Sequence, residues 1–148
     1  MSTSWTNLLA ANRVAREPTS KQELAELREM ATLNLQDADV KGLSARGRYE
    51  FAYNAARLLA TLVVRAAGYR VIAKGGHHFY TFAAMEITDS AFAKAAAYFD
   101  SARSKRNDFS YDSPIPISDT DSDELVQTVK EFAQKAEAWI KSKHPSLA

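Results

Sequence analysis

Between residues 100 and 112 the sequence gathers side chains that suit phosphate recognition. A helix that persists to residue 111 would carry one polar face made of positions i, i+3, i+4, i+7 and i+8, namely Arg103, Arg106, Asn107, Ser110 and Tyr111. A guanidinium clamps phosphate through two parallel hydrogen bonds, and Asn107 and Tyr111 would add neutral ones. The alternative is a helix C-terminus whose arginines offset the helix dipole and pair with Asp100 or Asp108.

A second set of polar residues lies in the long apolar stretch from residue 44 to 67. Asn54, Arg57, Thr61 and Arg65 follow one another at spacings of three, four and four, so they form one narrow stripe on a helix that is otherwise apolar. One interpretation is a solvent-facing strip. The other is that Asn54 and Arg57 face a shared polar site and contribute to phosphate binding.

Two adjacent histidines, His77 and His78, invite a metal or acid–base interpretation. Neighbouring positions of a helix point about 100° apart, so the two imidazoles would not face one ligand together. The chain has no cysteine and no His-x-x-x-His pair to complete a metal site. We therefore expect the histidines to serve at a helix N-terminus or in packing, and we expect no metal.

These side chains must be positioned by helices. Five glycines and four prolines are too few for an all-β protein, whereas helix-period patterns recur throughout. The patterns predict an all-α fold, an antiparallel bundle of four main helices with a short third helix between the second and the last two. The predicted helices cover residues 20–37, 44–67, 77–87, 90–110 and 121–143, with a short amphipathic segment at 4–14.

Local signals set the ends of these helices. Ser20 and Glu23 have the spacing of a capping box, and Thr88 or Asp89 would cap the fourth main segment. Residues 112–118 contain two prolines and are expected to form a loop. The buried stripes predict a core of Leu24, Leu27, Leu59, Val63, Phe92, Phe99, Leu125, Phe132 and Ile140.

Composition places few further limits on function. At 148 residues, 46% apolar and 25% charged, the chain is expected to form one domain with an N-terminal extension at 1–19 and a bundle at 20–145. The absence of cysteine, of a signal peptide pattern and of a long apolar run favours the reducing cytosol and no membrane. The net charge of +1, divided as +4 on residues 1–111 and −3 on 112–148, does not by itself predict a polyanion partner.

Three stretches, in this order, carry a resemblance to a known family: FAYNAARLLATLVVRAAGY, GGHHFYTFAAM and AKAAAYFDSARSKRNDFSYD. Together they resemble the HEPN superfamily of small helical bundles, which occur in bacterial toxin systems, RNA-processing factors and antiviral defence. The family signature is an arginine followed by a polar residue, usually asparagine, and then by a histidine four to six residues later. Arg106 and Asn107 match its first two positions.

The third signature position differs, because Tyr111 stands where the histidine is expected. In active members the resemblance implies metal-independent RNA cleavage, which needs a base that is unprotonated near neutral pH and a cation for the developing charge. Arg106 would supply the cation. A tyrosine with a pKa of about 10 is a poor base, although His78 from another helix offers a substitute.

Three functions therefore remain open. The first is binding of RNA or a nucleotide phosphate at Arg106, Asn107 and Tyr111 with weak or no nuclease activity, and the second is an active ribonuclease, the toxin of a toxin–antitoxin or defence module. The third is a helical protein-interaction module. The resemblance further implies a homodimer, no cofactor, and a partner nucleotidyltransferase or antitoxin that would modify Tyr111 with AMP.

Overall fold

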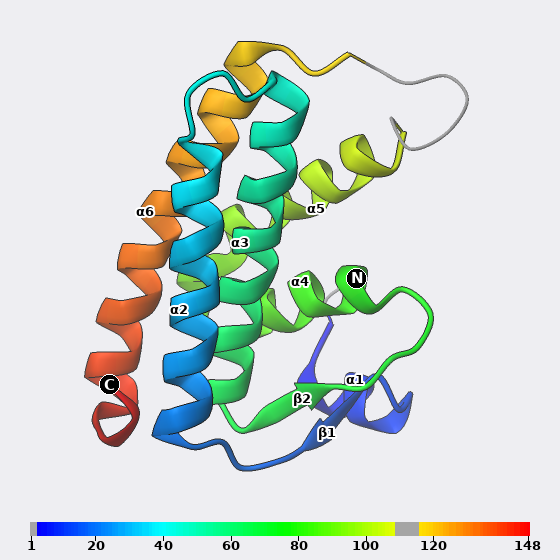
Figure 1. Ribbon diagram of the computed structural model, residues 1–148. Coiled ribbons are helices and arrows are strands. Elements are labelled where there is room, and N and C mark those ends of the chain that lie inside the picture. The colour runs from blue at the N-terminus through cyan, green and yellow to red at the C-terminus, as the bar shows by residue number, and fades with distance from the viewer. Residues whose placement is uncertain (1–2, 109–115) are drawn as a thin grey trace.

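The computed structural model describes residues 3–108 and 116–148, and they are mostly helical. Three long helices, α2 (Lys21–Ala38), α3 (Ala45–Ala66) and α6 (Asp119–Lys143), lie side by side (Figure 1). Two further helices, α4 (His77–Thr88) and α5 (Ala93–Asp108), also pack on α3, and α5 is inclined to the three long helices. The predicted all-α class is confirmed, and α3 is the central helix, which contacts α2, α4, α5 and α6.

The helices begin where the sequence places capping side chains. Ser20 accepts a hydrogen bond from the backbone N–H of Glu23 at 3.1 Å, and Ser44 caps α3 in the same way. At the start of α6, Ser118 Oγ accepts a hydrogen bond from the N–H of Asp121, and the Asp121 carboxylate accepts one from the N–H of Ser118. The predicted bounds of α2 and α3 are therefore correct to one residue, while α6 begins two residues earlier than predicted.

The segment before α5 and the end of α5 differ in detail from the prediction. A short 3-10 turn, η1 (Ser90–Phe92), precedes α5, and Asp89 accepts a hydrogen bond from the N–H of Ala91, as the predicted cap requires. Residues 109 and 110 of the predicted helix and 112–115 of the predicted loop lie outside the described residues. A second 3-10 turn, η2 (Pro145–Leu147), follows α6.

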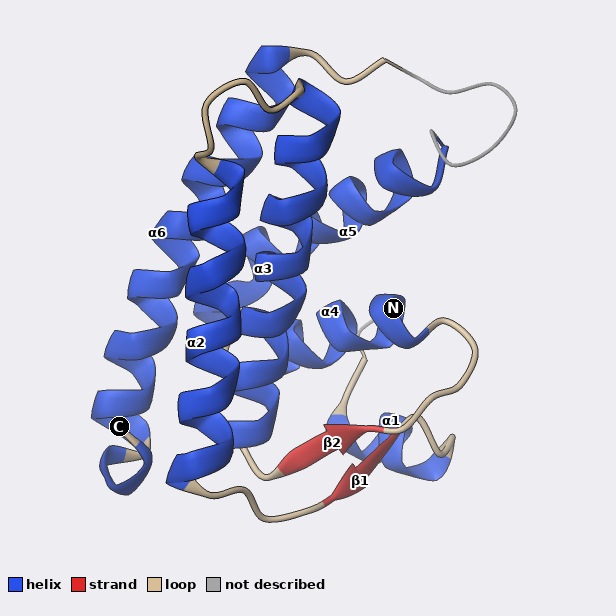
Figure 2. Ribbon diagram, in the orientation of Figure 1, coloured by secondary structure: helices blue, strands red, loops and turns tan. Residues whose placement is uncertain are grey.

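The main feature that the sequence analysis missed is a small antiparallel ribbon. After α1 (Trp5–Ala10), the strand β1 (Val14–Arg16) pairs with β2 (Tyr69–Val71), which follows α3 (Figure 2). The amphipathic segment expected at 4–14 thus contains α1 and ends at the first residue of β1. Three-residue strands are too short to produce a readable alternation of apolar and polar residues.

The core forms around the alanine-rich face of α3. Ala52, Ala55, Ala56 and Ala60 are fully buried, and such small side chains let neighbouring helices approach closely. The predicted core is confirmed except for Leu27, which is only partly buried. The aromatic part of this core consists of Phe82, Phe92, Phe99 and Phe132, whose rings contact one another mainly edge to face.

The end of α3 is held by a buried arginine. Arg65 is only 1% exposed and donates hydrogen bonds to the backbone carbonyls of Glu17, Pro18 and Tyr69 and to the Glu23 carboxylate. The hydrogen bond from Arg65, with help from Thr19 and Arg70, lowers the pKa of Glu23 to about 2. The prediction of a solvent-facing stripe is therefore wrong for Arg65, which ties the ribbon and the start of α2 to α3.

No helix among residues 3–108 and 116–148 has the length and apolar character needed to cross a membrane.

Candidate functional site

A buried tyrosine and a histidine from two different helices form the centre of the site. Tyr53 on α3 is fully buried, and its hydroxyl lies 2.9 Å from Nδ1 of His78, which is in the first turn of α4. The Tyr53 ring also contacts Phe82 edge to face at a centroid distance of 6.0 Å. Which atom of the hydrogen bond donates depends on the imidazole tautomer.

Two arginines reach this pair from the last turns of α5. The guanidinium carbon of Arg106 lies 5.0 Å from the centre of the Tyr53 ring, and its Nε donates to Glu50 Oε2 at 3.0 Å. Arg103 is one turn away and donates from Nε to Asp100 at 2.8 Å. Both guanidinium groups thus carry a carboxylate partner and remain partly exposed.

A third arginine comes from α3, one helical turn after Tyr53. The Nε of Arg57 is buried and has no hydrogen-bond partner. Among the described side chains, those of residues 3–107 and 116–148, no carboxylate forms an ion pair with its guanidinium, in contrast to those of Arg103 and Arg106. Buried polar atoms are nearly always hydrogen-bonded, so an unsatisfied guanidinium nitrogen next to a polar site calls for an explanation. We call Arg57, Arg103 and Arg106 the arginine cluster.

The electrostatic environment keeps both central groups neutral at pH 7. Burial, followed by the charges of Arg57, Arg106, His77 and Arg103, lowers the pKa of His78 to about 4. Burial raises the pKa of Tyr53 to about 12, although the three arginines act in the opposite direction. All three arginines thus act electrostatically on the Tyr53–His78 pair, and Arg106 also contacts the Tyr53 ring. A positive potential of this kind favours an anion.

The structure brings some of the predicted site residues together and leaves others apart or undescribed. Arg57, Arg103 and Arg106 all lie near enough to the Tyr53–His78 pair to influence its pKa values. Asn54 and Asn107 are half-buried on α3 and α5, beside Tyr53 and Arg106 in sequence. Ser110 and Tyr111 lie outside the described residues. The alternative prediction that these arginines pair with acidic neighbours is confirmed for Arg103, whose partner is Asp100.

Sequence reasoning missed Glu50 and Tyr53 as members of the site. A signal was present, because Glu50, Tyr53 and Arg57 have the spacing i, i+3 and i+7 of one helix face. Tyr53 lies among apolar residues in the sequence, which made it look like an ordinary core residue. Its partner lies 25 residues further along the chain, on another helix.

The two histidines turn to different protein groups. His77 Nδ1 lies 3.1 Å from the carbonyl oxygen of Ala73, whereas His78 turns to Tyr53. Within the part of the chain that the structure describes, no group of three histidine, aspartate or glutamate side chains is arranged to hold a metal ion.

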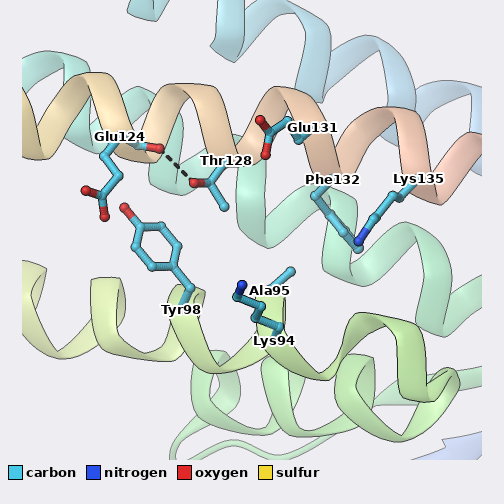
Figure 3. Close-up of a pocket in the computed structure, with 8 residues that line it drawn as sticks. All are labelled: Lys94, Ala95, Tyr98, Glu124, Thr128, Glu131, Phe132 and Lys135. Atoms are coloured by element: carbon cyan, nitrogen blue, oxygen red, sulfur yellow. Dashed lines mark hydrogen bonds between the residues drawn. The ribbon is translucent and has the colours of Figure 1, made fainter.

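A pocket of about 360 Å³ lies between α5 and α6, and none of the three arginines of the cluster lines it (Figure 3). In Figure 3 the Tyr98 hydroxyl points from α5 towards the Glu124 side chain of α6. Burial and Glu124 raise the pKa of Tyr98. Two lysines and two glutamates line this pocket, so their charges balance and favour neither an anion nor a cation: Lys94, Lys135, Glu124 and Glu131.

In comparisons with known proteins, no family model, no curated protein and no solved structure matches this chain.

Proposed function

We propose that this protein binds a phosphate group of RNA or of a nucleotide at the arginine cluster. The observation that carries the proposal is that Arg106 lies over the buried Tyr53 ring while the charges of Arg57 and Arg103 act on the same Tyr53–His78 pair. Guanidinium groups match phosphate oxygens in geometry and charge, and three of them around one point form a clamp.

The charge balance of the cluster supports an anionic ligand. Glu50 and Asp100 offset two of the three positive charges, and among the described side chains no carboxylate forms an ion pair with Arg57. A phosphate that carries about two negative charges would satisfy Arg57 and compete with Glu50 for Arg106. The partly exposed side chains of Arg103 and Arg106 give such a ligand access from solvent.

The neutral Tyr53–His78 pair adds hydrogen bonding to this clamp. If the Tyr53 hydroxyl donates to Nδ1, the imidazole carries its proton on Nε2 and can donate to a phosphate oxygen. If Nδ1 donates to the hydroxyl oxygen instead, Nε2 is an acceptor. The first tautomer suits binding, and the second is the one that a base requires.

The second tautomer supports a second candidate function, metal-independent RNA cleavage with His78 in place of the family's histidine. His78 Nε2 would take the proton of a ribose 2′-hydroxyl while the 2′-oxygen bonds to phosphorus and the bond to the 5′-oxygen breaks, and the leaving 5′-oxygen takes a proton from water to become a hydroxyl. Arg106 would hold the charge that develops on the phosphate. A pKa of about 4 makes His78 a weak base at neutral pH, and we therefore favour binding over cleavage.

We include in this proposal that the chain is a HEPN-like domain. It is supported by the order of the helices and by the place of Arg106 and Asn107 in the last described turns of α5. With it we propose a cytosolic homodimer in which the α5 helices meet, and a partner nucleotidyltransferase or antitoxin in a toxin or defence module. A pure protein-interaction role gives no reason for three arginines to act on His78.

The experiment that tests the proposal incubates purified protein with labelled single-stranded RNA and a metal chelator. We expect salt-sensitive binding with little cleavage, and loss of binding in Arg106→Ala. The matched control is Arg28→Ala, since Arg28 pairs with Glu137 on another face of the bundle. Rapid cleavage that disappears in His78→Gln would establish the second function. Binding that survives Arg106→Ala but not Arg28→Ala would refute both.

A further inference from the structure

Next to the arginine cluster lies a cavity that the phosphate clamp itself does not use. It has a volume of about 220 Å³ and lies between α4 and α5. Its apolar wall includes Phe79, Phe82, Ala83 and Ala97, and its polar groups include the carboxylates of Glu86 and Asp100. Pockets for drug-sized ligands measure about 300–1,000 Å³, so this cavity suits a smaller, flat group. We call it the α4–α5 cavity.

Two contacts connect the cavity directly with the arginine cluster. Asp100, which lines the cavity, is the ion-pair partner of Arg103 at 2.8 Å. Phe79, which also lines it, has the guanidinium carbon of Arg103 5.6 Å from its ring centre. His78, the neighbour of Phe79 in sequence, belongs to the Tyr53–His78 pair. A ligand bound to Arg103 through its phosphate would therefore have the cavity at its side.

Phe79 has the exposure expected of a stacking surface rather than of a core residue. It is 44% exposed, in contrast to Phe82 in the next turn of α4, which is 2% exposed. An exposed aromatic ring with an arginine over it is a combination that proteins use to stack nucleobases of single strands.

We propose that the α4–α5 cavity receives the nucleobase of the nucleotide whose phosphate the arginine cluster holds. The inference rests on the proposed function and names the ligand of the same site as a nucleoside phosphate unit, either free or within single-stranded RNA. The base stacks on Phe79, and its edge faces Glu86 and Asp100.

The two carboxylates also define which bases fit. A carboxylate only accepts hydrogen bonds, so it favours a base edge that carries an exocyclic amine. Guanine, adenine and cytosine have this amine and uracil does not. Asp100 keeps acceptor capacity beside its bond to Arg103, because one carboxylate has about four acceptor positions. Glu86 is exposed, and within the described ranges no side chain forms an ion pair with it.

Calorimetric titrations of one protein preparation separate this inference from the proposed function. The ligands are ribose 5-phosphate and the 5′-monophosphates of guanosine, adenosine, cytidine and uridine. We expect the three amine-bearing nucleotides to bind roughly fivefold to a hundredfold more tightly than ribose 5-phosphate, the range that base stacking contributes. Uridine monophosphate should be the weakest nucleotide. Short single-stranded oligoadenylate and oligouridylate then show whether the preferred unit is free or part of a strand.

Two variants locate the effect. Phe79→Ala should bring the nucleotides down to the affinity of ribose 5-phosphate, and Glu86→Gln should remove the preference over uridine. The control is Met30→Ala, an equally exposed apolar residue on α2. Equal affinity for ribose 5-phosphate and all nucleotides would overturn the base cavity alone. Failure of every phosphate compound to bind would overturn the proposed function and this inference together.

Discussion

The hydroxyl of Tyr53 and Nδ1 of His78 lie 2.9 Å apart, although one residue belongs to the middle of α3 and the other to the first turn of α4. This bond fixes the orientation of the imidazole beside the arginine cluster. The same position holds the His78 side chain neutral, since burial and the surrounding positive charges lower its pKa to about 4. The packing that positions the His78 imidazole therefore also keeps it unprotonated at neutral pH.

The first prediction concerns stability in mild acid. The pKa of His78 is lowered from 6.5 to about 4 by folding, so the unfolded chain binds more protons between these values. The associated stability is complete above pH 6.5 and is lost as the pH falls towards 4. We expect a loss on the order of 1 kcal/mol, discounted for the partial exposure of the ring.

Urea unfolding at pH 7 and pH 4.5 measures this effect when the wild type is compared with His78→Gln. The variant should lose less stability than the wild type between the two pH values. The Glu23 carboxylate contributes in a lower window, from about 4.5 down to 2, and so it does not mask the difference. Parallel losses in both proteins would show that His78 does not titrate as described.

The second prediction concerns the buried Arg65. Its replacement by methionine removes the donor for three backbone carbonyls and for Glu23, so the variant should lose about 3–5 kcal/mol of unfolding free energy. Arg28→Met breaks the partly exposed ion pair with Glu137 and should cost at most about 1 kcal/mol. Equal midpoints of urea denaturation for the two variants would refute the role assigned to Arg65.

The contrast between these two arginines shows what sequence patterns can and cannot predict. The start of α2 was predictable, because Ser20 caps the helix through Glu23, three positions away. The role of Arg65 was not, because its partners Glu17 and Glu23 precede it by more than 40 residues, in a loop and in another helix. A helical period places a residue on a face, but it does not say what covers that face.

The candidate site follows the same rule. The polar face of α5 made Arg103 and Arg106 predictable, and the stripe on α3 pointed to Arg57. Tyr53 could not be identified, since only the packing of α4 against α3 brings His78 to its hydroxyl. The spacing of residues within one helix therefore pointed to the three arginines. The Tyr53–His78 contact, in contrast, depends on how two helices pack.

The third prediction concerns the aromatic core. Phe99 is fully buried and its ring contacts Phe82 and Phe132, so Phe99→Ala should cost about 3–5 kcal/mol. The exposed Phe79 is the matched control, and Phe79→Ala should change stability by less than about 1 kcal/mol. Calorimetric melting of the wild type, Phe99→Ala and Phe79→Ala measures both effects. An unchanged melting temperature for Phe99→Ala would contradict the core described above.

The fourth prediction concerns assembly. Light scattering at micromolar concentration should give twice the mass of the 16.4 kDa chain, since the proposed homodimer joins two copies through α5. Substitution of the exposed Ser104 on α5 by glutamate should shift the mass towards one chain if that helix forms the interface. A single-chain mass for the wild type over the whole concentration range would contradict the dimer.

The salt dependence of RNA binding by wild type and Arg57→Ala tests the central claim, that the arginine cluster holds phosphate, most directly. One clamped phosphate of a single strand contributes about −0.7 to the slope of log affinity against log salt. Arg57→Ala should weaken binding and make the slope less steep, while Arg28→Ala leaves both unchanged. An Arg57→Ala protein with the affinity and slope of the wild type would contradict the claim.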